Sequence, residues 1–165
     1  MAKIGEQTFD LLSTSPEHTR SIAEQLGGAL LSGDVICLQG DLGAGKTTFV
    51  QGLAHGWGSQ DMVSSPTFIL VNLYRRADGA QLFHFDTYRL ESIAEAEELD
   101  LEAMMTRGAL IIEWPERLGD LLPRERLWIH FEHVDEGRRR IRFLAANGRP
   151  AQLLERIHHV PAGAV

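Results

Sequence analysis

One short segment of this chain has the residue types and the spacing to bind phosphate. Residues 40–47 read Gly-Asp-Leu-Gly-Ala-Gly-Lys-Thr and match the pattern G-x-x-x-x-G-K-[ST] in full. Glycines let the backbone fold around a phosphate with its N–H groups pointing inward. Lys46 can reach the outer phosphates of a nucleotide, and Thr47 offers a hydroxyl to Mg²⁺. The predicted nucleotide-binding residues are Gly40, Asp41, Leu42, Gly43, Ala44, Gly45, Lys46, Thr47 and Thr48.

The surroundings of this segment fit a phosphate-binding loop. Residues 35–38 form a continuous apolar run, typical of a buried parallel strand, and Phe49, Leu53 and Trp57 then recur at helical spacing. A strand, a glycine-rich turn and a helix in this order direct the helix N-terminus at a bound phosphate. Only two of the 16 basic residues are Lys, so chance rarely places a lysine in such a turn. We therefore expect a nucleotide site rather than an ordinary glycine-rich turn.

Phosphoryl transfer also needs carboxylates near the phosphates, and two acidic residues are placed for this. Asp86 ends the run 82–86, and Glu113 ends the apolar run 109–113. Ligands of open α/β sheets lie beyond the carboxyl ends of the strands, so both side chains can reach the loop. We favour Asp86 on the metal side and Glu113 as an outer partner of the metal or as the base that positions water. The spacing leaves the reverse assignment open, and a solvated charge at a strand end is the alternative for each.

Three further positions each have two interpretations. Thr67 follows Ser65-Pro66 in a segment that is either a switch sensing the γ-phosphate and Mg²⁺ or an ordinary Ser-Pro turn. Trp114 either stacks near the nucleotide or fills the core, and core filling is the default for an aromatic residue after an apolar strand. His84 is expected to be a strand residue with a satisfied ring rather than a metal ligand, because no second His lies at ligand spacing.

The identity of the nucleotide follows from a missing motif. The sequence contains no Asn-Lys-x-Asp stretch, which is the usual reader of guanine, so ATP or ADP is the expected nucleotide. Arg138 and the segment around Ser15 are candidates for contacts to the base.

The elements that must hold these residues suggest an α/β domain with a mixed sheet. Buried strands alternate with helices early in the chain, and hairpins are added later. Ser15 and Pro16 have the residue types of a helix start. The expected elements are strands over 8–12, 35–38 and 109–112, a helix from Ser15 that ends at Gly33-Asp34, a helix from Lys46, mostly helical structure over 90–105, and hairpins over 68–75 with 80–86 and 127–133 with 140–144.

Length and composition narrow the class of protein. At 165 residues the chain predicts one domain, 1–165, with a flexible basic tail from about residue 150. No apolar run approaches the roughly 20 residues that span a bilayer, and the N-terminus lacks the pattern of an export signal. The single cysteine, Cys37, is expected to be a buried, reduced thiol. These features predict a cytoplasmic globular protein that does not contact membranes.

Charge is unevenly distributed around a net value of −7. Residues 86–136 carry 5 basic and 14 acidic side chains, whereas residues 138–165 carry 6 basic and 1 acidic. An acidic total argues against broad nucleic-acid binding, because neutralising phosphates needs a basic face. The basic segment 138–165 leaves open a weaker, local binding of nucleic acid.

Four blocks of the sequence together resemble one family. The loop 40–48, then Ser65-Pro66-Thr67, then the block 84–90 (His-Phe-Asp-Thr-Tyr-Arg-Leu), then Glu113-Trp114-Pro115 resemble the bacterial TsaE (YjeE) family in residue type and order. The blocks span most of the chain, and the length is similar too. The resemblance implies a P-loop NTPase fold, with a mixed, mostly parallel sheet, added hairpins and helices on both faces.

The same resemblance implies an activity and partners. Family members are Mg²⁺-dependent ATPases of the machinery that makes threonylcarbamoyl-adenosine in tRNAs reading ANN codons. They act through the TsaD–TsaB pair, which carries the transfer chemistry, so contact with tRNA is expected to be only indirect. By resemblance, Lys46, Asp86 and Glu113 are the catalytic residues, Thr47, Asp86 and Glu113 serve the metal, Thr67 lies in a switch-like loop, and Trp114 lies near the nucleotide.

Two other functions and one further surface stay open at this point. A small-molecule kinase would share the phosphate loop, and Arg138-Arg139-Arg140 could imitate its arginine lid, although these residues fall at a hairpin turn. A nucleotide-gated binding module with incidental hydrolysis is the second alternative. An acidic run is either a solvated helix face or an electrostatic contact with a partner subunit; it comprises Glu91, Glu95, Glu97, Glu98, Asp100 and Glu102.

Overall fold

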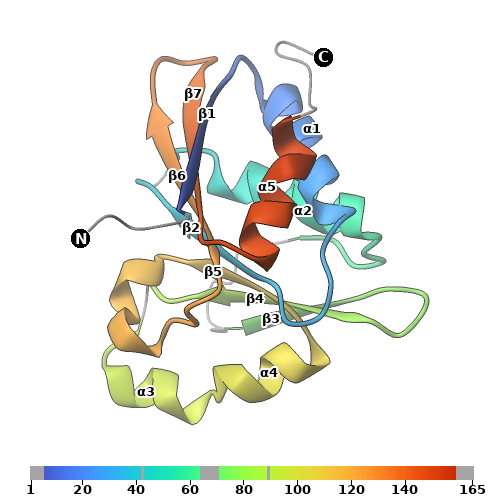
Figure 1. Cartoon of the computed structure of the whole chain (residues 1–165), viewed down its shortest axis with the longest axis vertical. Helices are drawn as coiled ribbons and strands as arrows, with labels where there is room; N and C mark the ends of the chain where they lie inside the picture. Colours follow the sequence, from blue (N-terminus) through green and yellow to red (C-terminus); the bar gives the residue numbers. More distant parts are fainter. Residues whose placement is uncertain (1–5, 42, 64–70, 89, 159–165) are drawn as a thin grey trace.

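The helices of the described chain pack on a seven-stranded mixed sheet (Figure 1). The computed structural model describes residues 6–41, 43–63, 71–88 and 90–158. Their elements are β1 (Gln7–Ser13), α1 (Pro16–Gly27), β2 (Val35–Gln39), α2 (Lys46–Trp57), β3 (Val71–Arg75), β4 (Gln81–Asp86), α3 (Ile93–Glu98), α4 (Leu101–Arg107), β5 (Gly108–Glu113), β6 (Leu127–His133), β7 (Arg139–Ala145) and α5 (Arg149–His158). Two short 3₁₀ turns, Pro115–Arg117 and Gly119–Leu121, follow β5.

The strand order β1-β7-β6-β2-β5-β4-β3 places the phosphate-loop strand β2 at the centre of the sheet. The pairs β6–β2, β2–β5 and β5–β4 are parallel, so the carboxyl ends of these four strands meet at one edge. The remaining pairs, β1–β7, β7–β6 and β4–β3, are antiparallel and extend the sheet on both sides. The predicted α/β class, the mixed sheet and both hairpins are confirmed, with residues 68–70 of the first hairpin outside the described part.

Helices cover both faces of the sheet. Successive side chains of a strand point to opposite faces, and the central strands are apolar on both, so both faces must be buried. Helices α1, α2 and α5 pack on one face, against Leu82 and Ile111 among others. Helices α3 and α4 and the 3₁₀ turns pack on the opposite face, against Phe83, Phe85 and Cys37. Figure 1 shows the two groups of helices on opposite sides of the strands. In the described part of the chain, no helix combines the length and apolar character needed to cross a membrane.

Close packing of α1 on α2 fixes the direction of the helix that follows the phosphate loop. A Cβ atom on Gly27 would lie 2.2 Å from the carbonyl oxygen of Leu53, and one on Gly56 would lie 2.2 Å from that of Glu24. Only glycine allows two helix backbones to approach this closely. The N-terminus of α2 is thereby held against the end of β2.

One predicted helix boundary is wrong, and one predicted helical stretch is interrupted, each for a local reason. Helix α1 ends at Gly27 and not at Gly33-Asp34, because the glycine pair at 27–28 weakens it and the next two amides, of Ala29 and Leu30, bond to carbonyls three residues back. The mostly helical structure predicted over 90–105 is confirmed, and it is divided into the two helices α3 and α4. Asp100, at a φ of 50°, accepts a bond from the amide of Ala103 and so begins α4 as an N-cap.

The predicted flexible tail from about residue 150 is wrong for residues up to 158, which form α5. Leu153, Leu154 and Ile157 are buried in the core on the side of α1 and α2. Arg149 anchors the start of the helix through two bonds to the buried carboxylate of Asp34, Nε–Oδ1 and Nη2–Oδ2, both 2.9 Å. The basic composition concealed an amphipathic helix with an apolar stripe.

Candidate functional site

The phosphate loop lies where the parallel strand β2 meets the N-terminus of α2. Gly43 and Gly45 adopt φ angles of 80° and 107°, which side-chain-bearing residues rarely reach, so the sequence needs glycine there. Gly45 occupies the N-cap position of α2 and brings no side chain to cover the first amides of the helix. These amides and the positive end of the helix dipole form a site for an anion.

Lys46 is buried at the floor of this loop, with 5% of its surface exposed. Its Nζ donates to the carbonyl oxygen of Gly40 at 2.5 Å and lies 3.7 Å from the ring centroid of Trp114. Burial lowers the pKa of the ammonium, while the carboxylates of Glu113 and Asp86 act in the opposite direction. A buried cation held by one carbonyl and one ring is poised to gain a much stronger anionic partner.

The two predicted carboxylates lie side by side next to the loop. Parallel pairing of β4 with β5 places Asp86 directly across from Glu113. Asp86 is partly buried, and its Oδ1 accepts a bond from the amide of Tyr88 at 2.9 Å. Burial raises the pKa of Asp86, and the neighbouring Glu113 charge adds to the rise, although the Tyr88 amide and Lys46 oppose it. Such a pair binds a cation readily, because a cation relieves the repulsion between the carboxylates.

A buried chain of hydrogen bonds holds the Glu113 carboxylate from behind. Glu113 is 7% exposed, and its Oε2 lies 2.5 Å from Nε2 of His84. The other ring nitrogen of His84 lies 2.9 Å from the hydroxyl of Tyr74. With the hydroxyl donating to Nδ1, a neutral His84 donates from Nε2 to Glu113, and every polar atom of the ring is used. The expectation that His84 is a strand residue with a satisfied ring is confirmed.

Trp114 lies over the phosphate loop instead of filling the core. It is half-buried, and its backbone has a φ of 57°, which is rare for a non-glycine residue. Thr87 holds this conformation, because its Oγ1 donates to the carbonyl oxygens of Trp114 at 2.5 Å and of Glu113 at 3.0 Å. The ring also stacks at 5.0 Å on Tyr88. Strand β4 therefore fixes the Glu113 carboxylate, and the two residues that follow it, Thr87 and Tyr88, fix Trp114.

A cavity of about 470 Å³ opens beside the loop. Its volume falls in the range typical of small-molecule sites. Glycines of the loop form one wall, Trp114 and Glu116 form a second, and the end of β6 from His130 to His133 forms the third.

Arg139 reaches the loop from the far hairpin, whereas the sequence suggests it only as part of a possible arginine lid. Its Nη2 lies 3.4 Å from the carbonyl oxygen of Gly43, and its buried Nε has no partner among the described residues. Arg138, the predicted candidate for the base, is paired with Asp135 instead. Ser15 caps α1, and Ser13, two residues before it, pairs in register with Arg139, so the Ser15 region lies beside the strand whose Arg139 contacts the loop. The β6–β7 connection is a short turn without the length of a lid.

The predicted site residues therefore fall into two groups. Lys46, Thr47 and Thr48 form the first turn of α2, next to the described loop residues, with Asp86, Glu113 and Trp114 close to Lys46. Leu42 and Thr67 lie outside the described residues. Tyr74 and Thr87 were missed, and Arg139 was considered only as part of a lid, because pairing across strands was needed to locate the contacts of these residues.

Comparisons with known proteins point to one family. The family model described as "Threonylcarbamoyl adenosine biosynthesis protein TsaE" matches residues 13–141. The tRNA threonylcarbamoyladenosine biosynthesis protein TsaE of Bacillus subtilis is 40% identical over 147 residues, which cover 88% of this chain and 90% of the relative. Its counterpart in Treponema pallidum is 37% identical over 131 residues, covering 79% and 96%. A crystal structure of Bacillus subtilis YdiB has a TM-score of 0.76 and 32% identity, covering 93% of this chain and 95% of that one. The loop, the fold and these relatives together show that this chain belongs to the TsaE family of P-loop proteins.

Proposed function

We propose that this chain is the Mg²⁺-dependent ATPase subunit required for threonylcarbamoyl-adenosine modification of tRNAs that read ANN codons. One observation carries the proposal: a buried lysine in a phosphate loop lies beside a pair of carboxylates, Asp86 and Glu113, on adjacent parallel strands. Phosphoryl transfer depends on this combination of cradle, cation and acids. The family's part in tRNA threonylcarbamoyladenosine biosynthesis supplies the pathway.

The loop would bind ATP through its backbone amides and Lys46. The ammonium, now bonded to the Gly40 carbonyl, needs only a side-chain rotation to meet the outer phosphates. Arg139 supports the loop at Gly43, and its buried Nε offers one more donor on the side where β1 and β7 meet. The base is proposed to lie on this side, close to the predicted Ser15 region.

The donor set fits Mg²⁺. The described residues contain no group of three or more His, Cys, Asp or Glu able to hold a metal. Mg²⁺ does not require one, because it is usually held by one or two carboxylates together with waters and substrate phosphates. Asp86 and the Thr47 hydroxyl would hold it, and Mg²⁺ when bound would neutralise charge on the phosphates.

Glu113 is proposed to act as the base that orients the attacking water. His84 donates to Oε2 and so fixes the plane of the carboxylate. In the described part of the chain, no other side chain bonds to the carboxylate of Glu113, so Oε1 can accept a proton from water. Asp86, the more exposed of the two acids, is the better placed for a hydrated ion. The structure thus supports the assignment favoured from the sequence, with Asp86 on the metal side.

TsaD and TsaB type proteins are the proposed partners. The acidic run on α3 and α4 supports a contact surface, because Glu91, Glu97, Glu98, Asp100 and Glu102 are exposed. Exposed acidic side chains are stable in water without any partner. A contact through them therefore depends on a basic patch in the partner.

Reconstitution of tRNA modification tests the proposed function. Purified TsaD, TsaB and tRNA are assayed over many cycles with and without this protein, each with ATP or a non-hydrolysable analogue. We expect sustained product only with this protein and ATP. Product that does not depend on this protein would contradict the proposal. Full support by the analogue, or by a Glu113→Ala variant that binds ATP, would favour the nucleotide-gated module over the ATPase.

A further inference from the structure

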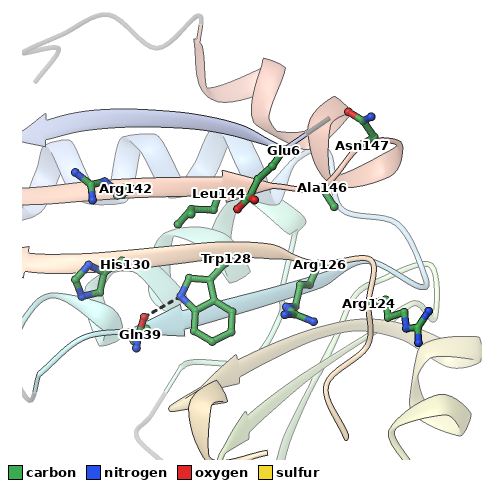
Figure 2. Close-up of a pocket in the computed structure, with 10 residues that line it drawn as sticks. All are labelled: Glu6, Gln39, Arg124, Arg126, Trp128, His130, Arg142, Leu144, Ala146 and Asn147. Atoms are coloured by element: carbon green, nitrogen blue, oxygen red, sulfur yellow. Dashed lines mark hydrogen bonds between the residues drawn. The ribbon is translucent and has the colours of Figure 1, made fainter. Parts of the chain in front are cut away.

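A second cavity, of about 570 Å³, lies along β6 and β7, on the sheet face opposite α1, α2 and α5, and Trp128 in its lining also packs against the core beneath α3 and α4. Alternation along β6 sends Leu127, Ile129 and Phe131 into the core on the side of α1, α2 and α5. Trp128 and His130 therefore face the other way, together with Arg142 of β7. Figure 2 shows these side chains along the two strands, with Arg124 and Arg126 at one end.

The lining of this cavity is basic, although the protein as a whole is acidic. Among the described residues, three arginines and one carboxylate, Glu6, line it. Arg142 is paired with Asp10 through two bonds. Arg124 and Arg126, by contrast, form no salt bridge within the described ranges, and only the Pro123 carbonyl accepts a bond from Arg126. Two guanidinium groups are therefore available to an anionic ligand.

An aromatic ring fixed in place lies at the centre of the cavity. The indole Nε1 of Trp128 donates to Oε1 of Gln39 at 2.9 Å, and the guanidinium of Arg126 lies 5.6 Å from the ring centroid. Figure 2 shows Trp128 between Gln39 and Arg126. A ring held in one orientation loses little entropy when a planar group stacks on it. Gln39 ends β2 and directly precedes the phosphate loop.

From these features we propose that the second cavity binds one nucleotide of a single-stranded RNA segment. Its base would stack on Trp128, and Arg124 and Arg126 would bind the flanking phosphates, since a planar guanidinium matches phosphate in a two-bond geometry. An acidic protein segment would use the arginines and leave the ring without a role. The choice of RNA rests on the family's part in tRNA biosynthesis, and this direct contact departs from the expectation that tRNA is met only through partners.

The cavity adjoins the ATP site without being part of it. Gln39 and His130 line both cavities, so they form the shared wall. A single-stranded RNA bound along β6 and β7 would therefore pass the phosphate loop without contacting Lys46. This separation allows RNA binding and ATP binding to be removed independently.

Fluorescence anisotropy with a labelled single-stranded RNA of about 12 nucleotides tests the proposal on the full chain. We expect Trp128→Ala to weaken binding by about 5- to 150-fold, and Trp128→Phe to restore most of the affinity, because the smaller ring still stacks. Arg124→Gln and Arg126→Gln should each weaken binding and lower the salt slope by about 0.7, the value for one lost phosphate contact on a single strand. Arg156→Gln, the same charge change on the exposed side of α5, should have no effect.

A phosphate-loop variant, a competitor and a comparison of affinities separate the proposal from its alternatives. Lys46→Ala should retain RNA binding, and loss of binding in that variant with retention in Trp128→Ala would place the RNA at the phosphate loop and overturn the proposal. Polyglutamate competing as well as RNA would reveal a site for acidic protein segments and would also overturn it. Equal affinity of wild type, Trp128→Ala and Arg126→Gln would do the same, with folding of each variant checked by circular dichroism. None of these outcomes depends on ATP hydrolysis, so the proposed ATPase stands or falls separately.

Discussion

His84 Nε2 and Glu113 Oε2 lie 2.5 Å apart in the interior, on neighbouring parallel strands. His84 in turn meets the hydroxyl of Tyr74 on the next strand outward, so three strands contribute to the position of one carboxylate. A carboxylate fixed by buried partners loses little entropy when it engages water. Tyr74 and His84 are therefore positioning residues, whereas Glu113 is the group that would meet the reacting water.

Replacing His84 should lower the turnover of ATP and leave its binding intact. We expect His84→Ala to reduce kcat by about 10- to 100-fold, the usual loss when a partner that orients a functional ligand is removed. KM for ATP should change little, because His84 does not reach the loop. His84→Gln, whose amide can still donate to Glu113, should recover part of the rate. Steady-state kinetics of the two variants check this, and an unchanged kcat in His84→Ala would refute the positioning role.

Lys46 should not be replaceable by arginine. Lys46→Ala removes the cation from the loop and should abolish the stabilisation by ATP, which amounts to about 2.7 kcal/mol when the nucleotide is at 100 times its Kd. Lys46→Arg should also fail, since a planar guanidinium does not fit the pocket between the Gly40 carbonyl and the Trp114 ring. Thermal unfolding with and without Mg-ATP measures the effect. If Mg-ATP raised the unfolding temperature of Lys46→Arg as much as that of wild type, a positive charge alone would be enough for binding.

Cys37 should make the fold less stable at alkaline pH. Burial raises the pKa of this thiol from 9.0 to about 12. Between those values the unfolded chain has lost the proton and the folded chain keeps it, so the free energy of unfolding falls as pH rises, by at most about 1.4 kcal/mol per pH unit from this group. Urea unfolding at a series of pH values from about 8 upward measures the slope.

A Cys37→Ala variant supplies the comparison for that slope. The variant should be less stable at neutral pH, because removing the buried sulfur atom leaves an empty space in the core. Its free energy of unfolding should nevertheless fall less steeply as pH rises. Tyr74, whose pKa burial raises to about 12, remains in both proteins and gives a common residual slope. Identical slopes in the two proteins would rule out the thiol as the cause.

Helix α5 should be required for stability. Leu154 is fully buried, so Leu154→Ala should cost about 2–5 kcal/mol in the free energy of unfolding. Gln152→Ala, on the exposed side of the same helix, should cost almost nothing. Urea unfolding of both variants gives the difference, and equal stabilities would mean that α5 does not belong to the core.

The sequence predicted most of the parts of the site but not their mutual contacts. The loop, Asp86 and Glu113 could be found because each follows an apolar strand, and strand ends in an α/β sheet converge. The position of Tyr74 behind His84 depends on hairpin register, which one-dimensional spacing does not encode. Arg139 approaches Gly43 only because β7 lies two strands from β2, a long-range pairing that single-residue patterns do not reveal.

The errors in the fold have a similar origin. Helix α5 was mistaken for a flexible tail because six arginines after residue 137 outweighed three apolar positions, and only packing against α1 shows that those three matter. The break between α3 and α4 depends on Asp100, an N-cap residue inside a strongly helical composition. Caps decide where helices start, and an acidic run hides them.

Phosphate release by wild type and by Glu113→Gln, measured in the same samples as nucleotide affinity, tests the central claim most directly. The amide preserves the size of the side chain and can still bond to His84, but it cannot accept a proton from water. We predict unchanged Mg-ATP affinity and a rate of phosphate release lower by about 10²–10⁴, the usual loss for a general base. Equal rates of release at equal affinity would contradict the account.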